Sequence, residues 1–93
     1  MRLSEQERKS ILQIVQQKDH DAEIYLFGSR VDDSARGGDI DILIISDKLT
    51  FSDKIDIKLE LYRQIGEQKI DIIIDRDIHK PFTRIAYEQG LRL

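Results

Sequence analysis

The order of hydrophobic and polar positions along this chain predicts alternating helices and strands. In residues 4–18, apolar residues recur at three- and four-residue spacing, which is the period of one helix face. Ser4 and Glu7 have the S-x-x-E spacing of a capping box, so we expect this helix to begin after Ser4. Shorter runs rich in aliphatic and aromatic residues predict strands. These runs are residues 23–27, 39–46 and 69–75.

Residues 51–66 fit both periods. The stretch "IDIKLEL" alternates like a strand, with apolar residues at every second position. A helix would instead place its apolar residues along one stripe, made of Phe51, Ile55, Leu59 and Tyr62 with Ile65 beside it. The length of the segment and its many good helix formers favour the helix. Ser52 is then the expected N-terminal cap.

The C-terminal part of the chain predicts one more helix. Pro81 suits the first turn of a helix, and Gly90 suits its end after Gln89. Residues 31–38 are rich in small and polar residues and predict a loop, and a second helix or a helical turn near Ser29 is left open. The order of elements predicts an α/β (α+β) fold with one small mixed β-sheet flanked by helices. We expect a single domain over residues 1–93.

Two of the predicted strands contain acidic residues within apolar runs. Asp39 and Asp41 stand two positions apart at the start of "DIDILIIS", and Asp71 lies between Ile70 and Ile72. Residues two apart in a strand share a face, so the three carboxylates converge if the strands are neighbours. Clustered carboxylates repel one another unless a hard cation such as Mg²⁺ lies between them. The alternative is that each is a solvated residue at a strand end.

Gly28-Ser29 ends a predicted strand and is a candidate anion site. Glycine lets the backbone approach a ligand closely, and backbone N–H groups with a hydroxyl can hold a phosphate. Arg30 follows at once and could pair with phosphate oxygens. The segment lacks the G-K-[ST] of a P-loop, and an ordinary strand-ending turn is the alternative.

Composition narrows the class of protein. The chain has 93 residues, 40% hydrophobic and 35% charged, as in a globular protein. Its net charge of −3 argues against a dedicated nucleic-acid binder, which normally has a basic excess. The lack of cysteine excludes disulfides and thiolate metal sites. The N-terminus does not look like a signal peptide and no apolar run could span a bilayer, so we expect a cytoplasmic protein.

Three segments together form a specific pattern: "FGSR", then "GGDIDILI", and later "IDIII". This pattern resembles the minimal nucleotidyltransferase (MNT) family of the DNA polymerase β-like nucleotidyltransferase superfamily. The resemblance extends over nearly the whole chain. It implies a Mg²⁺-dependent nucleotidyltransferase with two metal ions, and a mixed sheet flanked by helices.

The resemblance also implies a role for each candidate residue. Asp39, Asp41 and Asp71 would be the catalytic and metal-ligating carboxylates, with Asp71 helping to deprotonate the attacking hydroxyl. The nucleotide implied by the resemblance is ATP. The residues implied to bind it are Gly28, Ser29 and Arg30. Two ions could stabilise the attacking and leaving oxygens of an in-line displacement at the α-phosphate.

Small relatives of this kind are often paired with a HEPN-domain toxin. By resemblance, this chain would be the antitoxin of a toxin–antitoxin pair and would add AMP to a tyrosine of its HEPN partner (AMPylation). A non-catalytic antitoxin that neutralises its partner by contact is the alternative. A small-molecule nucleotidyltransferase is less favoured because the chain is short, and no nucleic-acid substrate is expected. Homo-oligomer formation stays open.

Overall fold

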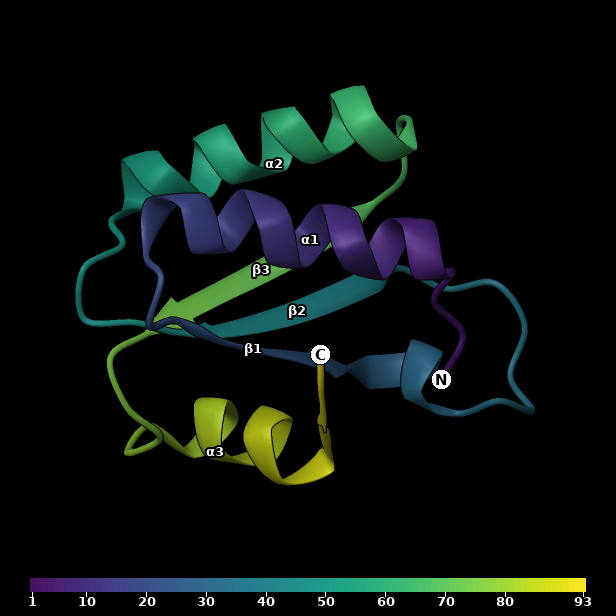
Figure 1. Ribbon diagram of the computed structural model, residues 1–93. Helices are drawn as coiled ribbons and strands as arrows, with labels where there is room; N and C mark the ends of the chain where they lie inside the picture. Colours follow the sequence, from purple (N-terminus) through teal and green to yellow (C-terminus); the bar gives the residue numbers. More distant parts are fainter.

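A four-stranded mixed sheet forms the centre of the molecule, and the computed structural model describes all of residues 1–93 (Figure 1). The strands are β1 (Glu23–Phe27), β2 (Ile40–Ile45), β3 (Ile70–Asp75) and β4 (Leu91–Arg92). They lie in the order β3-β2-β1-β4. β1 pairs antiparallel with both β2 and β4, whereas β2 pairs parallel with β3. The predicted small mixed sheet is therefore confirmed.

Three α-helices cover the two faces of this sheet. They are α1 (Glu5–Lys18), α2 (Phe51–Ile65) and α3 (Pro81–Gln89), and a 3-10 turn, η1 (Gly28–Val31), follows β1. Figure 1 shows α1 and α2 together over one face and α3 over the other. The connection through α2 allows β2 and β3 to run parallel. The predicted α+β class is therefore confirmed. None of the three helices has the length and apolar character needed to cross a bilayer.

The helix starts follow local capping chemistry. Ser4 caps α1 through a complete capping box, as predicted. The cap of α2 is Thr50, and the prediction of Ser52 is wrong. Thr50 accepts a hydrogen bond from the backbone N–H of Asp53, and the Asp53 carboxylate accepts one from the Thr50 N–H. This reciprocal pair satisfies two free backbone donors, which a cap at Ser52 would leave unmatched.

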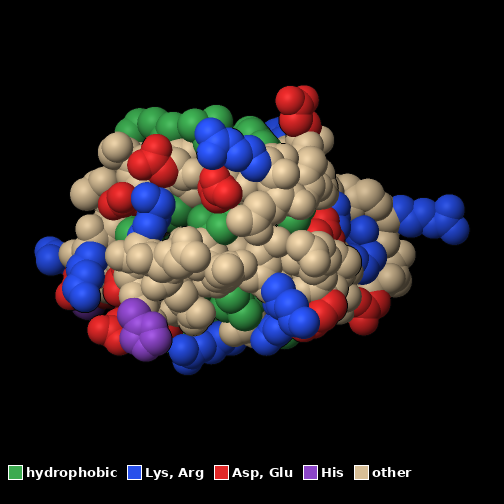
Figure 2. All heavy atoms as spheres, turned by 45° about the horizontal axis from the view of Figure 1, so that its top comes forward, with side chains coloured by type: hydrophobic (Ala, Val, Ile, Leu, Met, Phe, Trp, Pro, Cys, Tyr) green, Lys and Arg blue, Asp and Glu red, His purple; other side chains and the backbone are tan.

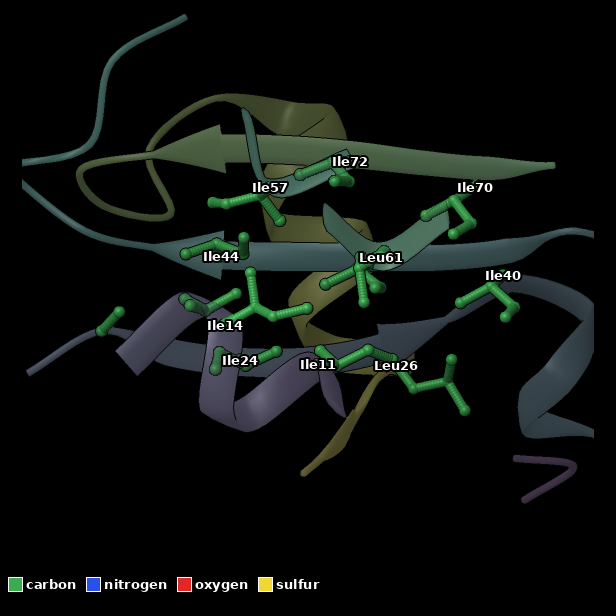
Figure 3. Packing of buried hydrophobic residues seen from close by; sticks show 13 residues of the cluster. Ile11, Ile14, Ile24, Leu26, Ile40, Ile44, Ile57, Leu61, Ile70 and Ile72 are labelled. Carbon is green, nitrogen blue, oxygen red and sulfur yellow. The ribbon is translucent and has the colours of Figure 1, made fainter. Parts of the chain in front are cut away.

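The main core lies between the sheet and the pair α1 and α2. Alternate residues of β2 and β3 point into it, because side chains in a strand alternate between faces. Figure 3 shows these side chains meeting those of the two helices: Ile40, Ile44, Ile70 and Ile72 against Ile11, Ile14, Ile57 and Leu61. A smaller cluster of Tyr25, Leu43 and Ala86 lies on the α3 side. The intervening residues Asp41 and Asp71 therefore belong to the α3 side of the sheet.

The helix predicted over 51–66 is present, but it buries a different stripe. Ile57 and Leu61 are fully buried, whereas Phe51, Ile55 and Leu59 are 73%, 46% and 52% exposed. An apolar helix stripe ordinarily packs on a core. Here α2 contacts both the sheet and α1, and that packing selects the face with Ile57 and Leu61. Figure 2 shows hydrophobic side chains along the upper rim of the molecule, over α2.

The last strand, β4, was not predicted from the sequence. Gly90 ends α3 as expected, and the chain then pairs with β1 at Leu91 and Arg92. The Leu93 N–H also donates to the Ile24 carbonyl at 2.9 Å. A strand of two residues is too short to show alternation, so only the position of β1 makes it form.

Asp19 is the only charged side chain that is buried, at 3% exposure. It accepts a hydrogen bond from the Ser46 hydroxyl at 2.5 Å and one from the Asp21 N–H at 3.0 Å. The Ser46 hydrogen bond keeps the pKa of Asp19 below its ordinary value, although burial opposes this. This contact joins the loop after α1 to the end of β2.

Two isoleucines of α2 provide a matched test of the fold. Ile57→Ala should lower the free energy of unfolding by about 2–5 kcal/mol, because it leaves a cavity in the core. Ile55→Ala should change it by less than about 1 kcal/mol, because Ile55 is half exposed. Urea unfolding followed by circular dichroism would measure both. Equal losses would contradict this packing, because they would mean that Ile55 is as well packed as Ile57.

Candidate active site

Asp41 and Asp71 are direct neighbours across the sheet. In the parallel pairing of β2 with β3, Asp41 is the register partner of Asp71. Adjacent strands lie about 4.8 Å apart, and partners in register point to the same face. The predicted convergence of these two carboxylates is therefore confirmed. Asp71 is exposed and Asp41 is half-buried, so the pair opens to solvent on the α3 side of the sheet.

Asp39 lies just before β2, close enough to Asp41 that its negative charge raises the pKa of Asp41. The Lys69 ammonium lies 3.4 Å from an Asp39 carboxylate oxygen. The backbone joins the same two segments, since the Ile40 N–H donates to the Lys69 carbonyl at 3.1 Å. The three carboxylates therefore differ in their neighbours. Two of them, Asp41 and Asp71, are adjacent, and the third is paired with a lysine.

The surroundings of Asp41 disfavour its charged form. Burial raises the pKa of Asp41 above its ordinary value, and the negative charges of Asp71 and Asp39 raise it further. Lys69 opposes this shift only in part, because it is the last and smallest of these influences. A buried carboxylate beside like charges is a common feature of functional sites and an unusual one in a core. A nearby cation would remove the cause of the shift.

Gly28 lies directly against Asp41. Its φ is +76°, and a Cβ at this position would be 2.2 Å from Asp41 Oδ2. Any side chain there would displace the carboxylate, so only glycine allows the backbone of η1 to approach it this closely. The predicted role of Gly28 in a close backbone approach is consistent with this contact.

A second glycine, Gly38, lies close to the side chain of Ser29. A Cβ on Gly38, whose φ is +91°, would be 2.2 Å from the Ser29 hydroxyl oxygen. The loop that contains Gly38 therefore passes directly over the Ser29 side chain, just before Asp39. Ser29 itself is exposed and lies in the 3-10 turn η1, so the helical turn left open by the sequence is present.

Arg30 is held by contacts within the protein. Its guanidinium donates to the Arg2 carbonyl at 2.9 Å and to the Gly38 carbonyl at 3.3 Å. Arg2, which the sequence analysis did not select, donates to the Ser29 carbonyl at 3.0 Å. The two arginines thus hold η1 in place. The predicted contact of Arg30 with phosphate stays a prediction. Arg2 could not have been selected from the sequence, because an arginine in a polar N-terminal stretch is not unusual.

The carboxylates lie on an open surface. The larger of the molecule's two surface cavities, about 490 Å³, lies between α1 and α2 and includes Leu59 and Arg63. The second lies where α2 meets β3, near Phe51 and Ile74. Both are away from Asp41. The chemistry of the site therefore depends on groups displayed at one end of the sheet, where β1 ends and β2 and β3 begin.

The sequence matches the Polymerase beta, Nucleotidyltransferase family over residues 9–93. The chain belongs to this family. Comparison with curated proteins gave no match. The nucleotidyltransferase assignment agrees with the resemblance drawn from the motifs, and the mixed sheet with flanking helices is the expected fold. As a nucleotidyltransferase domain, the chain is suited to move a nucleotidyl group from a nucleotide to an acceptor.

Removing the charge of Asp41 should stabilise the metal-free domain. The folded-state pKa of Asp41 is above 3.8, so its ionisation lowers the free energy of unfolding as the pH rises from 3.8 through that pKa. Asp41→Asn should therefore raise the thermal midpoint at pH 7 in EDTA. Asp47→Asn, at an exposed loop position, should leave the midpoint unchanged. A lower midpoint for Asp41→Asn would contradict the repulsion described here.

Two glycines with positive φ separate backbone strain from steric conflict. Gly37→Ala should cost about 1 kcal/mol, because its φ is +63° but nothing lies within 4 Å of the new Cβ. Gly28→Ala should cost more than about 2 kcal/mol, because the same strain is joined by a clash with Asp41. Chemical denaturation of both variants would measure the difference. Equal losses would mean that Gly28 and Asp41 are not in close contact.

Proposed function

We propose that this nucleotidyltransferase transfers AMP from Mg²⁺-ATP to a tyrosine hydroxyl of a HEPN-domain toxin and acts as the antitoxin. The observation that best supports the proposal is the pair Asp41 and Asp71, held side by side on an open surface next to the Gly28-Ser29 turn. An open site suits an acceptor that is itself a protein, because the acceptor can supply the missing walls. The partner and the acceptor rest on the resemblance to MNT proteins.

The residues present fit a divalent cation. Mg²⁺ is commonly bound by one or two carboxylates together with substrate phosphates. Asp41 and Asp71 supply two adjacent carboxylates, and Asp39 could supply a third by leaving Lys69. Burial and the repulsion from Asp71 and Asp39 both raise the pKa of Asp41, and a bound cation would offset the cost of keeping this carboxylate charged. When bound, Mg²⁺ would polarise the α-phosphate and stabilise the charge on the leaving pyrophosphate.

The chain's own groups have distinct tasks in this reaction. Backbone N–H groups of η1 and the Ser29 hydroxyl hold the triphosphate. The acceptor oxygen forms a bond to the α-phosphorus while the bond from that phosphorus to the pyrophosphate oxygen breaks. Asp71, the exposed carboxylate, accepts the proton of the acceptor hydroxyl. The products are AMP joined to the acceptor through a phosphodiester, and free pyrophosphate.

A second function is supported by a different surface. The exposed residues Phe51, Ile55 and Leu59 form an apolar stripe on α2, away from the carboxylates. Such a stripe is typical of a protein–protein contact. An antitoxin that neutralises its toxin by contact alone would use a surface of this kind and would not need Asp71.

The deciding experiment follows the label of ATP into the toxin. The purified domain is incubated with its HEPN partner, Mg²⁺ and ATP labelled at either the α- or the γ-phosphate. We expect label on the partner from α-labelled ATP only, and loss of more than about 100-fold in rate for Asp71→Asn. Asp47→Asn serves as the exposed control with the same chemical change.

The outcomes separate the two functions. Neutralisation by contact alone would be favoured by three results together. The Asp71→Asn variant would still neutralise the toxin, the two proteins would form a stable complex on a sizing column, and the wild-type reaction would leave no label on the toxin. Transfer from γ-labelled ATP would show phosphoryl transfer and contradict the proposal. EDTA should stop the transfer of label, because the proposed reaction requires Mg²⁺ at the carboxylates.

A further inference from the structure

We propose that the exposed ring of Phe82, held edge-to-face by Phe27, is the platform on which the nucleobase of the substrate stacks. This inference rests on the proposed function, since it requires a nucleotide at the carboxylates. It assigns a binding role to Phe82, which lies in none of the motifs, and a supporting role to Phe27, the first residue of the "FGSR" segment. It also fixes the direction in which the nucleotide lies across the sheet.

Phe27 lies beside the carboxylates. It is the last residue of β1 and the antiparallel register partner of Asp41, which is in turn the partner of Asp71. Side chains of such partners lie about 4.5–5.5 Å apart on the same face. Phe27, Asp41 and Asp71 therefore form one row across three neighbouring strands. Phe27 also precedes Gly28 directly, so the aromatic ring and the phosphate-binding turn are adjacent in the chain.

Phe82 extends this aromatic surface from the other side. It stands in the first turn of α3, and its ring lies 6.4 Å from that of Phe27 at an interplanar angle of 83°. This is an edge-to-face pair, which fixes the relative orientation of the two rings. Phe82 is nevertheless 64% exposed, and Ile85, one turn further along α3, is 52% exposed. A large aromatic ring is thus held in a defined place while most of it stays open to solvent.

A nucleobase is the ligand that suits such a surface. A flat aromatic ring can stack on any nucleobase, because every base has a π face. Such stacking contributes substantially to the free energy of binding. With the triphosphate at Gly28 and Ser29, the base would extend toward β1 and α3. The acceptor would then approach from β3, the edge strand, where Asp71 is exposed. This direction keeps the base and the acceptor on opposite sides of Asp41.

The test compares ATP with inorganic tripolyphosphate, which has the phosphates but no base. Binding of each to the domain in Mg²⁺ is measured by calorimetry for the wild type, Phe82→Ala, Phe82→Tyr and Phe51→Ala. We expect Phe82→Ala to weaken ATP binding about tenfold and to leave tripolyphosphate binding unchanged. Phe82→Tyr should keep ATP binding, because it keeps the ring. Phe51→Ala removes a ring on α2 that is even more exposed, at 73%, and should change neither affinity.

Three results would overturn the platform. ATP binding by Phe82→Ala within about twofold of the wild type would show that the ring does not contact the base and serves another surface, such as a protein contact. Equal affinity of the wild type for ATP and tripolyphosphate would show that the base adds nothing. If the wild type binds neither probe, the proposed function itself fails together with the platform.

Discussion

Asp41 and Asp71 repel each other, and the pairing of β2 with β3 holds them side by side against that repulsion. The parallel register that makes them partners is maintained by the isoleucines on the opposite face, which are buried under α1 and α2. Shifting that register by one residue would turn the isoleucines outward. The hydrophobic core therefore holds two carboxylates in contact that would separate if they were free. Burial of Asp41 and this enforced proximity to Asp71 together raise the pKa of Asp41.

The same alternation divides the sheet into a stabilising face and a functional one. Residues of β2 and β3 that point toward α1 and α2 form the main core. The residues between them in the chain point to the opposite face, which is partly open to solvent. α3 covers only part of that second face, around Tyr25 and Leu43, and leaves Asp71 exposed. A site built on strands in this way is placed more accurately than one built on loops, because each strand is fixed by its neighbours.

Close backbone approach completes the site. Gly28 lies against Asp41, and Gly38 lies against Ser29, so two loops meet the carboxylates with no side chain between them. Arg2 and Arg30 then hold η1 through bonds to backbone carbonyls. Substituting Arg2 would disturb the position of the turn without touching a carboxylate. The turn that is proposed to bind phosphate is thus ordered before any ligand arrives.

From the sequence alone, the order of the three helices and the three longer strands could be predicted, and the candidate residues of the site could be selected. Periodicity predicted α1, whereas segment length and good helix formers decided α2. Pro81 and Gly90 marked the ends of α3, and runs of aliphatic and aromatic residues predicted the three longer strands. The acids within isoleucine runs and the Gly28-Ser29 turn predicted the candidate site, since local sequence alone makes such residues unusual there. What could not be predicted were features that depend on partners far away in the chain. The tertiary structure alone decided that β4 pairs with β1, that α2 turns Ile57 inward and Phe51 outward, that Arg2 supports η1, and that Phe82 meets Phe27, because each of these contacts joins segments that become neighbours only when the sheet has formed.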